Sequence, residues 1–117
     1  MATLLVHLAT GPENPTRAAL AMLVARTAAS EGHDVSVFLA GDAVHLLRPE
    51  TAAATHGIGT GVFEEHLAAL REARVRIYAS GMSSKARGVE PEAFGAEPAQ
   101  PQKLVELAIA AETTLTY

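Results

Sequence analysis

The segment SGMSSKARG, residues 80–88, holds most of the side chains in this sequence that could do chemistry together. It supplies the hydroxyls of Ser80, Ser83 and Ser84 and two cations, but no cysteine and no histidine. A serine hydroxyl becomes a nucleophile only when a neighbouring base activates it. The chain has no GxSxG pattern and no recognisable Ser–His–Asp arrangement. We therefore predict no catalytic residue, and we interpret Arg87 as a surface cation or an anion contact.

The histidines of the chain show no metal-ligand spacing such as HExxH. Cysteine is absent, which excludes disulfides, thiolate metal sites and thiol nucleophiles. We predict no metal site and no cofactor. His56 lies in a glycine-rich segment and is the best candidate for an imidazole that faces a ligand. His66 lies on the apolar face of a predicted helix, where we expect it to be partly buried, and His7 can belong to the core or to a crevice.

Length and composition predict one domain that spans residues 1–117. Hydrophobic residues make up 49% of the chain and charged residues 19%, as in a protein with a packed core. The net charge of −4 and the lack of a basic stripe argue against a nucleic-acid partner. No apolar stretch approaches the roughly 18 residues of a membrane span, and the first residues lack the basic part of a signal peptide. We expect a cytoplasmic protein with no membrane partner.

Strands and helices that alternate along the chain must position these residues. This alternation predicts an α/β domain with a mainly parallel sheet. We predict strands at residues 3–8, 34–39, 75–79 and 113–117, and helices at residues 15–31, 43–48, 62–73 and 101–112.

Three polar residues are predicted to cap these helices. Asn14, which a proline follows, is typical of a helix start, and we expect Asp42 and Thr60 to cap the two helices that come next. The residues between the elements have no clear periodicity. We interpret residues 50–61 as a long glycine-rich connection and residues 89–101 as an irregular surface excursion.

Ligands of parallel sheets bind beyond the carboxyl ends of the strands. Three segments follow strands here: TGPENPTR, AGDA and SGMSSKARG. The helix after Asn14 exposes free N–H groups that suit an anion, with Arg17 one turn further on. Alternatively, Asn14 only caps the helix and Arg17 is a solvated cation. No P-loop or dinucleotide fingerprint is present. The candidate ligand-binding residues are Thr10, Asn14, Arg17, Gly41, Asp42, His56, Ser80, Ser83, Arg87 and Gly88.

Four stretches, in this order, carry a resemblance to a known family: TLLVHLATGPENPTRAALA, VSVFLAGDAVHLL, the ARG of residues 86–88, and LVELAIAAETTLTY. Over essentially its full length the chain resembles the DsrE/DsrF-like (YchN-like) family of small sulfur-relay-related proteins. The resemblance implies a three-layer α/β/α domain with a sheet of four or five strands. It also implies assembly into a homotrimer or homohexamer.

In sulfur-transferring members of that family, the segment after the third strand often carries C-x-x-C followed by x-x-x-R-G. Here Ser80 and Ser83 stand where those cysteines would be, while Arg87 and Gly88 remain. A persulfide requires a thiolate of lowered pKa, and a serine hydroxyl cannot replace it. We therefore expect no cysteine persulfide sulfur transfer by this chain.

Three functions fit these observations. The first is a non-catalytic oligomeric protein that binds a small anionic ligand or acts as a scaffold. The second is the thiol-free subunit of a sulfur-relay hetero-oligomer, in which a paralogue supplies the cysteine. The third is an enzyme with Ser83 or His56 in a site at a subunit interface. Self-association is also favoured by the high apolar content of so small a domain, part of which we expect at interfaces.

Overall fold

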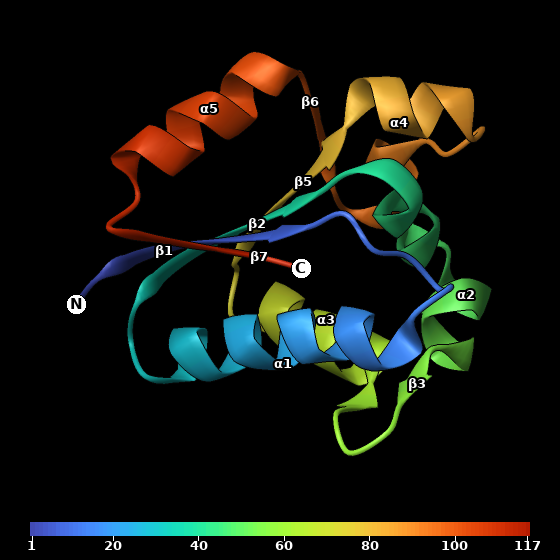
Figure 1. Cartoon of the computed structure of the whole chain (residues 1–117), viewed down its shortest axis with the longest axis horizontal. Coiled ribbons are helices and arrows are strands. Elements are labelled where there is room, and N and C mark those ends of the chain that lie inside the picture. The colour runs from blue at the N-terminus through green and yellow to red at the C-terminus, as the bar shows by residue number, and fades with distance from the viewer.

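A computed structural model describes residues 1–117. Its main sheet has five strands in the order β6-β5-β2-β1-β7, and every neighbouring pair is parallel. The predicted α/β fold with a mainly parallel sheet is confirmed, with helices on both faces of the sheet (Figure 1). The strands are β1 (Thr3–Leu8), β2 (Asp34–Leu39), β5 (Arg76–Ser80), β6 (Glu97–Ala99) and β7 (Thr113–Thr116).

The central strands β1 and β2 are apolar on both faces because helices cover both sides of the sheet. Side chains alternate along β1, so that Val6 and Leu8 join one core cluster while Leu5 joins another. This explains why the sequence TLLVHL is a nearly continuous apolar run instead of an alternating pattern.

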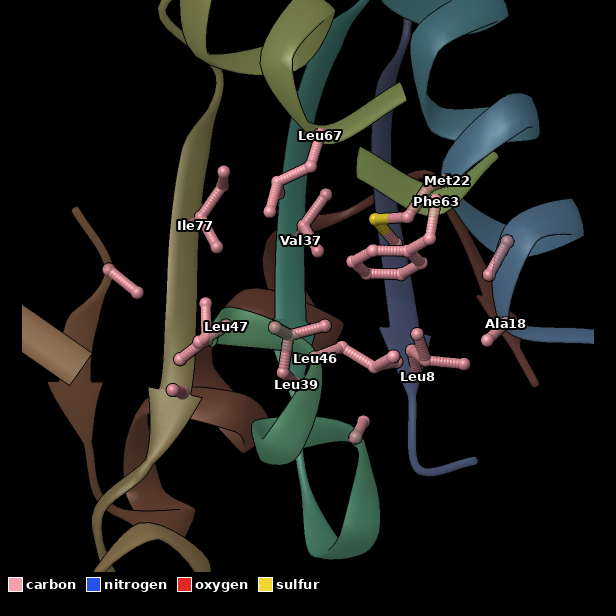
Figure 2. Close-up of a cluster of buried hydrophobic side chains, with 14 of the residues drawn as sticks. Leu8, Ala18, Met22, Val37, Leu39, Leu46, Leu47, Phe63, Leu67 and Ile77 are labelled. Atoms are coloured by element: carbon pink, nitrogen blue, oxygen red, sulfur yellow. The ribbon is translucent and has the colours of Figure 1, made fainter. Parts of the chain in front are cut away.

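One face of the sheet is packed against α1 (Pro15–Ser30) and α3 (Phe63–Glu72) (Figure 1). The buried side of α1 consists mainly of alanines, with Met22 as its only large side chain, so this helix lies close to the sheet. Phe63 and Leu67 of α3 fill the space beside it, against Val37 of β2 (Figure 2). This cluster contains 21 buried residues and is the main core of the protein.

The opposite face is covered mainly by α5 (Pro101–Ala110), which begins at the predicted proline (Figure 1). The buried cluster on this face contains only three residues, Leu5, Phe38 and Tyr78. No residue of α5 itself is buried, although most of its residues are apolar. The two faces of the sheet are therefore covered very unequally.

Two segments that we expected to be irregular contain regular structure. Residues 50–61 overlap α2 (Pro49–Ala54) and the small hairpin of β3 (His56–Gly57) and β4 (Gly61–Val62). The expectation of a long connection was therefore wrong, because Pro49 occupies a first helical position and begins a helix. Residues 89–101 contain the short 3-10 helix η2 (Pro91–Phe94) and the strand β6. β6 is an edge strand, where Pro98 is tolerated.

Of the three predicted caps, only the first is confirmed. The side chain of Asn14 accepts a hydrogen bond from the backbone N–H of Arg17 at 3.1 Å. Asp42 lies in the first turn of the 3-10 helix η1 (Gly41–Leu47). It does not cap this helix, because the carboxylate of Asp42 pairs with Arg87 instead. Thr60 lies too early to cap α3, which follows Val62, and its hydroxyl donates to a carbonyl of α1. None of the helices is both long enough and apolar enough to cross a membrane.

His7 lies on β1, half-buried, with its ring edge-on to Phe38 and 6.1 Å between ring centroids. Its Nε2 atom is buried and has no hydrogen-bond partner. Burial lowers the pKa of His7 below its ordinary value of 6.5, because a charged imidazole there would lose its hydration. At pH values below about 6.5 the unfolded chain therefore binds more protons at this position than the folded chain.

This difference predicts that the protein loses stability as the pH falls below about 6.5, and that His7→Leu removes part of the loss. The measurement is the free energy of unfolding in urea at about pH 7.5 and about pH 5.5. His56→Leu, at an exposed position, is the control for the loss of an imidazole as such, and the quantity compared is the difference between the two variants. An equal pH dependence in the His7 variant and the parent protein would contradict the prediction.

Candidate functional site

The carboxyl ends of β1, β2 and β5 lie at one edge of the sheet (Figure 1). The segments that follow β1 and β2 are in close contact there. A β-carbon on the buried Gly11 would overlap the carbonyl oxygen of Asp42. Only glycine therefore allows the first segment to pack on the second.

The segment after β5 is mainly a helix, α4 (Gly81–Ala86), and not the loop that we expected. Its N-cap is Ser80, whose hydroxyl oxygen accepts a hydrogen bond from the backbone N–H of Ser83 at 3.2 Å. The hydroxyls and cations of this segment are consequently held by helical backbone.

Hydrogen bonds join α4 to the start of η1. The hydroxyl oxygen of Ser83 accepts from the backbone N–H of Gly41 at 2.9 Å. The Nε of Arg87 donates to the carboxylate of Asp42 at 3.0 Å, and its Nη1 donates to the carbonyl of Ser83 at 3.1 Å. With Ser80, five of the predicted site residues are thus joined directly, but they act as donors and acceptors within the protein.

Arg48, which we did not predict, completes this arrangement. Its Nη2 donates to the carbonyl oxygens of Arg87 and Gly88, at 3.0 and 3.3 Å, and so satisfies the carboxyl end of α4. Its Nη1 lies 2.7 Å from the Nδ1 of His45. No pattern in the sequence distinguishes Arg48 from the exposed arginines. We call Gly41, Asp42, Arg48, Ser83 and Arg87 together the α4 clasp.

The other candidate residues lie outside the α4 clasp. Asn14 serves as a cap, and the side chain of Arg17 is exposed and makes no hydrogen bond within the chain. His56 is exposed on β3, where its Nε2 lies 2.8 Å from the carbonyl of Ala53. Thr10 is half-buried in the segment after β1. Ligand binding by any of the candidate residues stays a prediction.

His66 has the partly buried position that we expected. Its ring is almost fully enclosed, its Nε2 lies 2.7 Å from the carbonyl of Thr60, and its Nδ1 lies 3.4 Å from the Nη1 of Arg26. The imidazole therefore fastens α3 to α1 and to the hairpin that precedes it.

The α4 clasp lacks the partners that serine catalysis requires. No histidine or carboxylate is hydrogen-bonded to the hydroxyl of Ser80 or Ser83, so neither has a base within one chain. The charge of Arg87 is balanced by Asp42, which weakens its attraction for an anion. No three His, Asp or Glu side chains gather as metal ligands would. The hydrogen bonds of the α4 clasp hold α4 against η1.

The sequence profile of the DsrE/DsrF-like family matches residues 3–117. No protein of curated function matches the chain. In fold, the chain is similar to the crystal structure of the ychN protein from E. coli, with 19% identity, a TM-score of 0.80, and all of both chains covered. It is also similar to BT1422, a conserved protein of unknown function from Bacteroides thetaiotaomicron, with 14% identity and a TM-score of 0.76 over 99% of this chain and 95% of that one.

Substitution by alanine should change the free energy of unfolding differently at Ser83 and at Ser84, which are neighbours in α4. Ser83→Ala leaves the N–H of Gly41 without its partner and should lower the free energy of unfolding by about 1 kcal/mol. The hydroxyl of Ser84 is buried, at 2% exposure of the residue, and has no partner, so Ser84→Ala should cost nothing or stabilise. Urea unfolding of both variants tests this, and equal losses would show that the bond to Gly41 does not fasten α4.

Proposed function

The chain belongs to the DsrE/DsrF-like family, which confirms the resemblance seen in its sequence, and we propose that it is a self-associating, non-catalytic scaffold member of that family. The observation that carries the proposal is the incomplete cover of one sheet face. The cluster beneath α5 has three buried residues, against 21 on the other face. A second copy of this chain, docked on α5, would complete it.

The outer side of α5 supports this choice of partner. Val105 and Ile109 are 56% and 81% exposed and lie one turn apart, so they form a continuous apolar stripe. Helices this apolar are normally buried. In an antiparallel contact with a second copy, Val105 and Ile109 of each α5 would cover those of the other. A contact of this kind has twofold symmetry, which suits the homohexamer better than the homotrimer.

The non-catalytic part of the proposal rests on the α4 clasp. By the resemblance described above, Ser80 and Ser83 correspond to the cysteines of sulfur-transferring members, and each hydroxyl oxygen already accepts a hydrogen bond from a backbone N–H. The chain has no thiol to carry sulfur. The anion-binding function that we also considered is less favoured, because Arg87 is paired with Asp42. In the alternative function, as the thiol-free subunit of a sulfur-relay hetero-oligomer, a cysteine-bearing paralogue would dock on the face of α5 in place of a second copy.

The self-association is tested by placing a charge on the apolar stripe. Val105→Glu and Ile109→Glu should each convert the assembly to monomer, because a carboxylate in an apolar contact loses its hydration. Sedimentation equilibrium of the purified protein gives the oligomeric state directly.

Ile58→Glu is the matched control, since Ile58 is 89% exposed on the hairpin after β3, away from α5. That variant should keep the oligomeric state of the parent protein. A parent protein that sediments as a monomer would contradict the proposal, whereas assembly only with a cysteine-bearing paralogue would favour the hetero-oligomer.

Ser83→Cys tests whether the family geometry persists without its chemistry. The new sulfur would accept a hydrogen bond from the N–H of Gly41 and would lie near the cation of Arg87. The hydrogen bond and the nearby positive charge both stabilise a thiolate. We expect this variant to take up sulfane sulfur from excess donor, detected by mass spectrometry, while the parent protein takes up none. Ser84→Cys, at a buried position, is the control, and equal labelling of both variants would show that the site is not specific.

A further inference from the structure

A pocket of about 310 Å³ opens between α2, α3 and η2. This volume is within the usual range of small-molecule sites. Its floor is apolar and fully buried, formed by Leu47, Ala52 and Leu67, and Phe94 forms one wall. Leu47 and Leu67 belong to the main core cluster (Figure 2). The pocket belongs to the α3 side of the sheet, so docking on α5 would leave it open (Figure 1).

The pocket has two charged residues, Glu64 and Arg71, both on α3. They are seven residues apart, so their Cα atoms are separated by roughly 10 Å along the helix. The ion pairs of the chain are His33 with Glu31 and Arg87 with Asp42, so the two charges of the pocket are not paired with each other. The pocket therefore has a cationic end and an anionic end with an apolar floor between them.

Arg71 has unused hydrogen-bond donors at the cationic end. Its Nη2 donates to the carbonyl of Phe94, which is the only hydrogen bond of this side chain, while a guanidinium offers five N–H donors. One side of the guanidinium packs over Gly95, with Nε 3.6 Å from the position of a β-carbon there, and the other side is open. Burial of part of its side chain lowers the pKa of Arg71, although the residue as a whole is exposed. A carboxylate that binds here would accept charge-assisted hydrogen bonds from the unused donors of Arg71, and such bonds are stronger than those between neutral groups.

From this arrangement we infer that the pocket binds a short-chain aliphatic monocarboxylate. The carboxylate accepts hydrogen bonds from Arg71, and the hydrocarbon chain lies on Leu47 and Leu67. The carboxylate of Glu64 repels a second negative charge at the far end of the ligand, so a dicarboxylate of the same length is excluded. The site differs from the α4 clasp in its residues and in its ligand chemistry.

Three probes of equal chain length test the inference: hexanoate, the dicarboxylate adipate, and hexylamine. The measurement is the titration of the methyl NMR signals of Leu47 and Leu67 in the intact protein. Hexanoate should shift these signals saturably, and adipate and hexylamine should bind at least about tenfold more weakly. From butanoate to hexanoate, each added methylene should tighten the Kd by up to about fourfold.

Two variants and two controls locate the site. Arg71→Gln should weaken hexanoate binding at least about tenfold, since the charged partner of the carboxylate is lost. Ala93→Trp, at the exposed rim, should abolish binding by filling the mouth of the pocket. Arg76→Gln removes an exposed arginine outside the pocket and should bind hexanoate like the parent protein. Ile109→Glu should also bind normally, which separates this inference from the proposed self-association.

Absence of saturable hexanoate binding in the millimolar range would overturn the inference. So would equal affinity of Arg71→Gln and the parent protein, or tighter binding of hexylamine than of hexanoate. Shifts confined to α4 and to Gly41 and Asp42 would overturn it as well, because they would place the ligand at the α4 clasp.

Discussion

A parallel sheet needs both of its faces covered, and most features of this protein follow from that requirement. The central strands carry large apolar side chains on both faces, so water on either face would contact hydrocarbon. On one side α1 and α3 enclose a core of 21 residues, and the alanines of α1 allow that helix to lie close. On the other side a single helix of ten residues lies over three buried side chains. The shortage of cover on this second face is the physical basis for expecting another copy of the chain there.

The α4 clasp shows how the polar groups at the carboxyl ends of the strands are bonded to one another within the fold. Ser83 and Arg87 are hydrogen-bonded to the start of η1, and Arg48 satisfies the carboxyl end of the short helix. Each of these contacts uses a polar group as a hydrogen-bond donor or acceptor within the protein. The clasp therefore stabilises the edge of the sheet where ligands of α/β proteins usually bind. The apolar pocket under α3 lies elsewhere and uses charges that the fold leaves unpaired.

The main elements could be predicted from the sequence because their signals are local. The apolar runs of β1 and β2, Asn14 before its proline, and Pro101 each act within a few residues. The helical state of α4 could not be predicted, because Gly81 and two serines are weak helix formers and the bond from Gly41 comes from 42 residues away. A distant contact also sets the role of the Asp42 side chain. It pairs with Arg87, 45 residues away in the sequence, instead of capping its own helix. Of the site, the sequence therefore predicted which segments meet, but not how their groups are paired.

The strand β6 restricts the ways in which such a protein can associate. It ends the sheet with only three residues, and its middle residue, Pro98, has no N–H to offer a further strand. A neighbouring molecule therefore cannot readily extend the sheet at that edge, which disfavours open-ended fibres built by strand addition. In the proposed association through α5, growth would end once each exposed stripe is covered. With the proposed association through α5, Pro98 would favour closed particles of fixed size over aggregates.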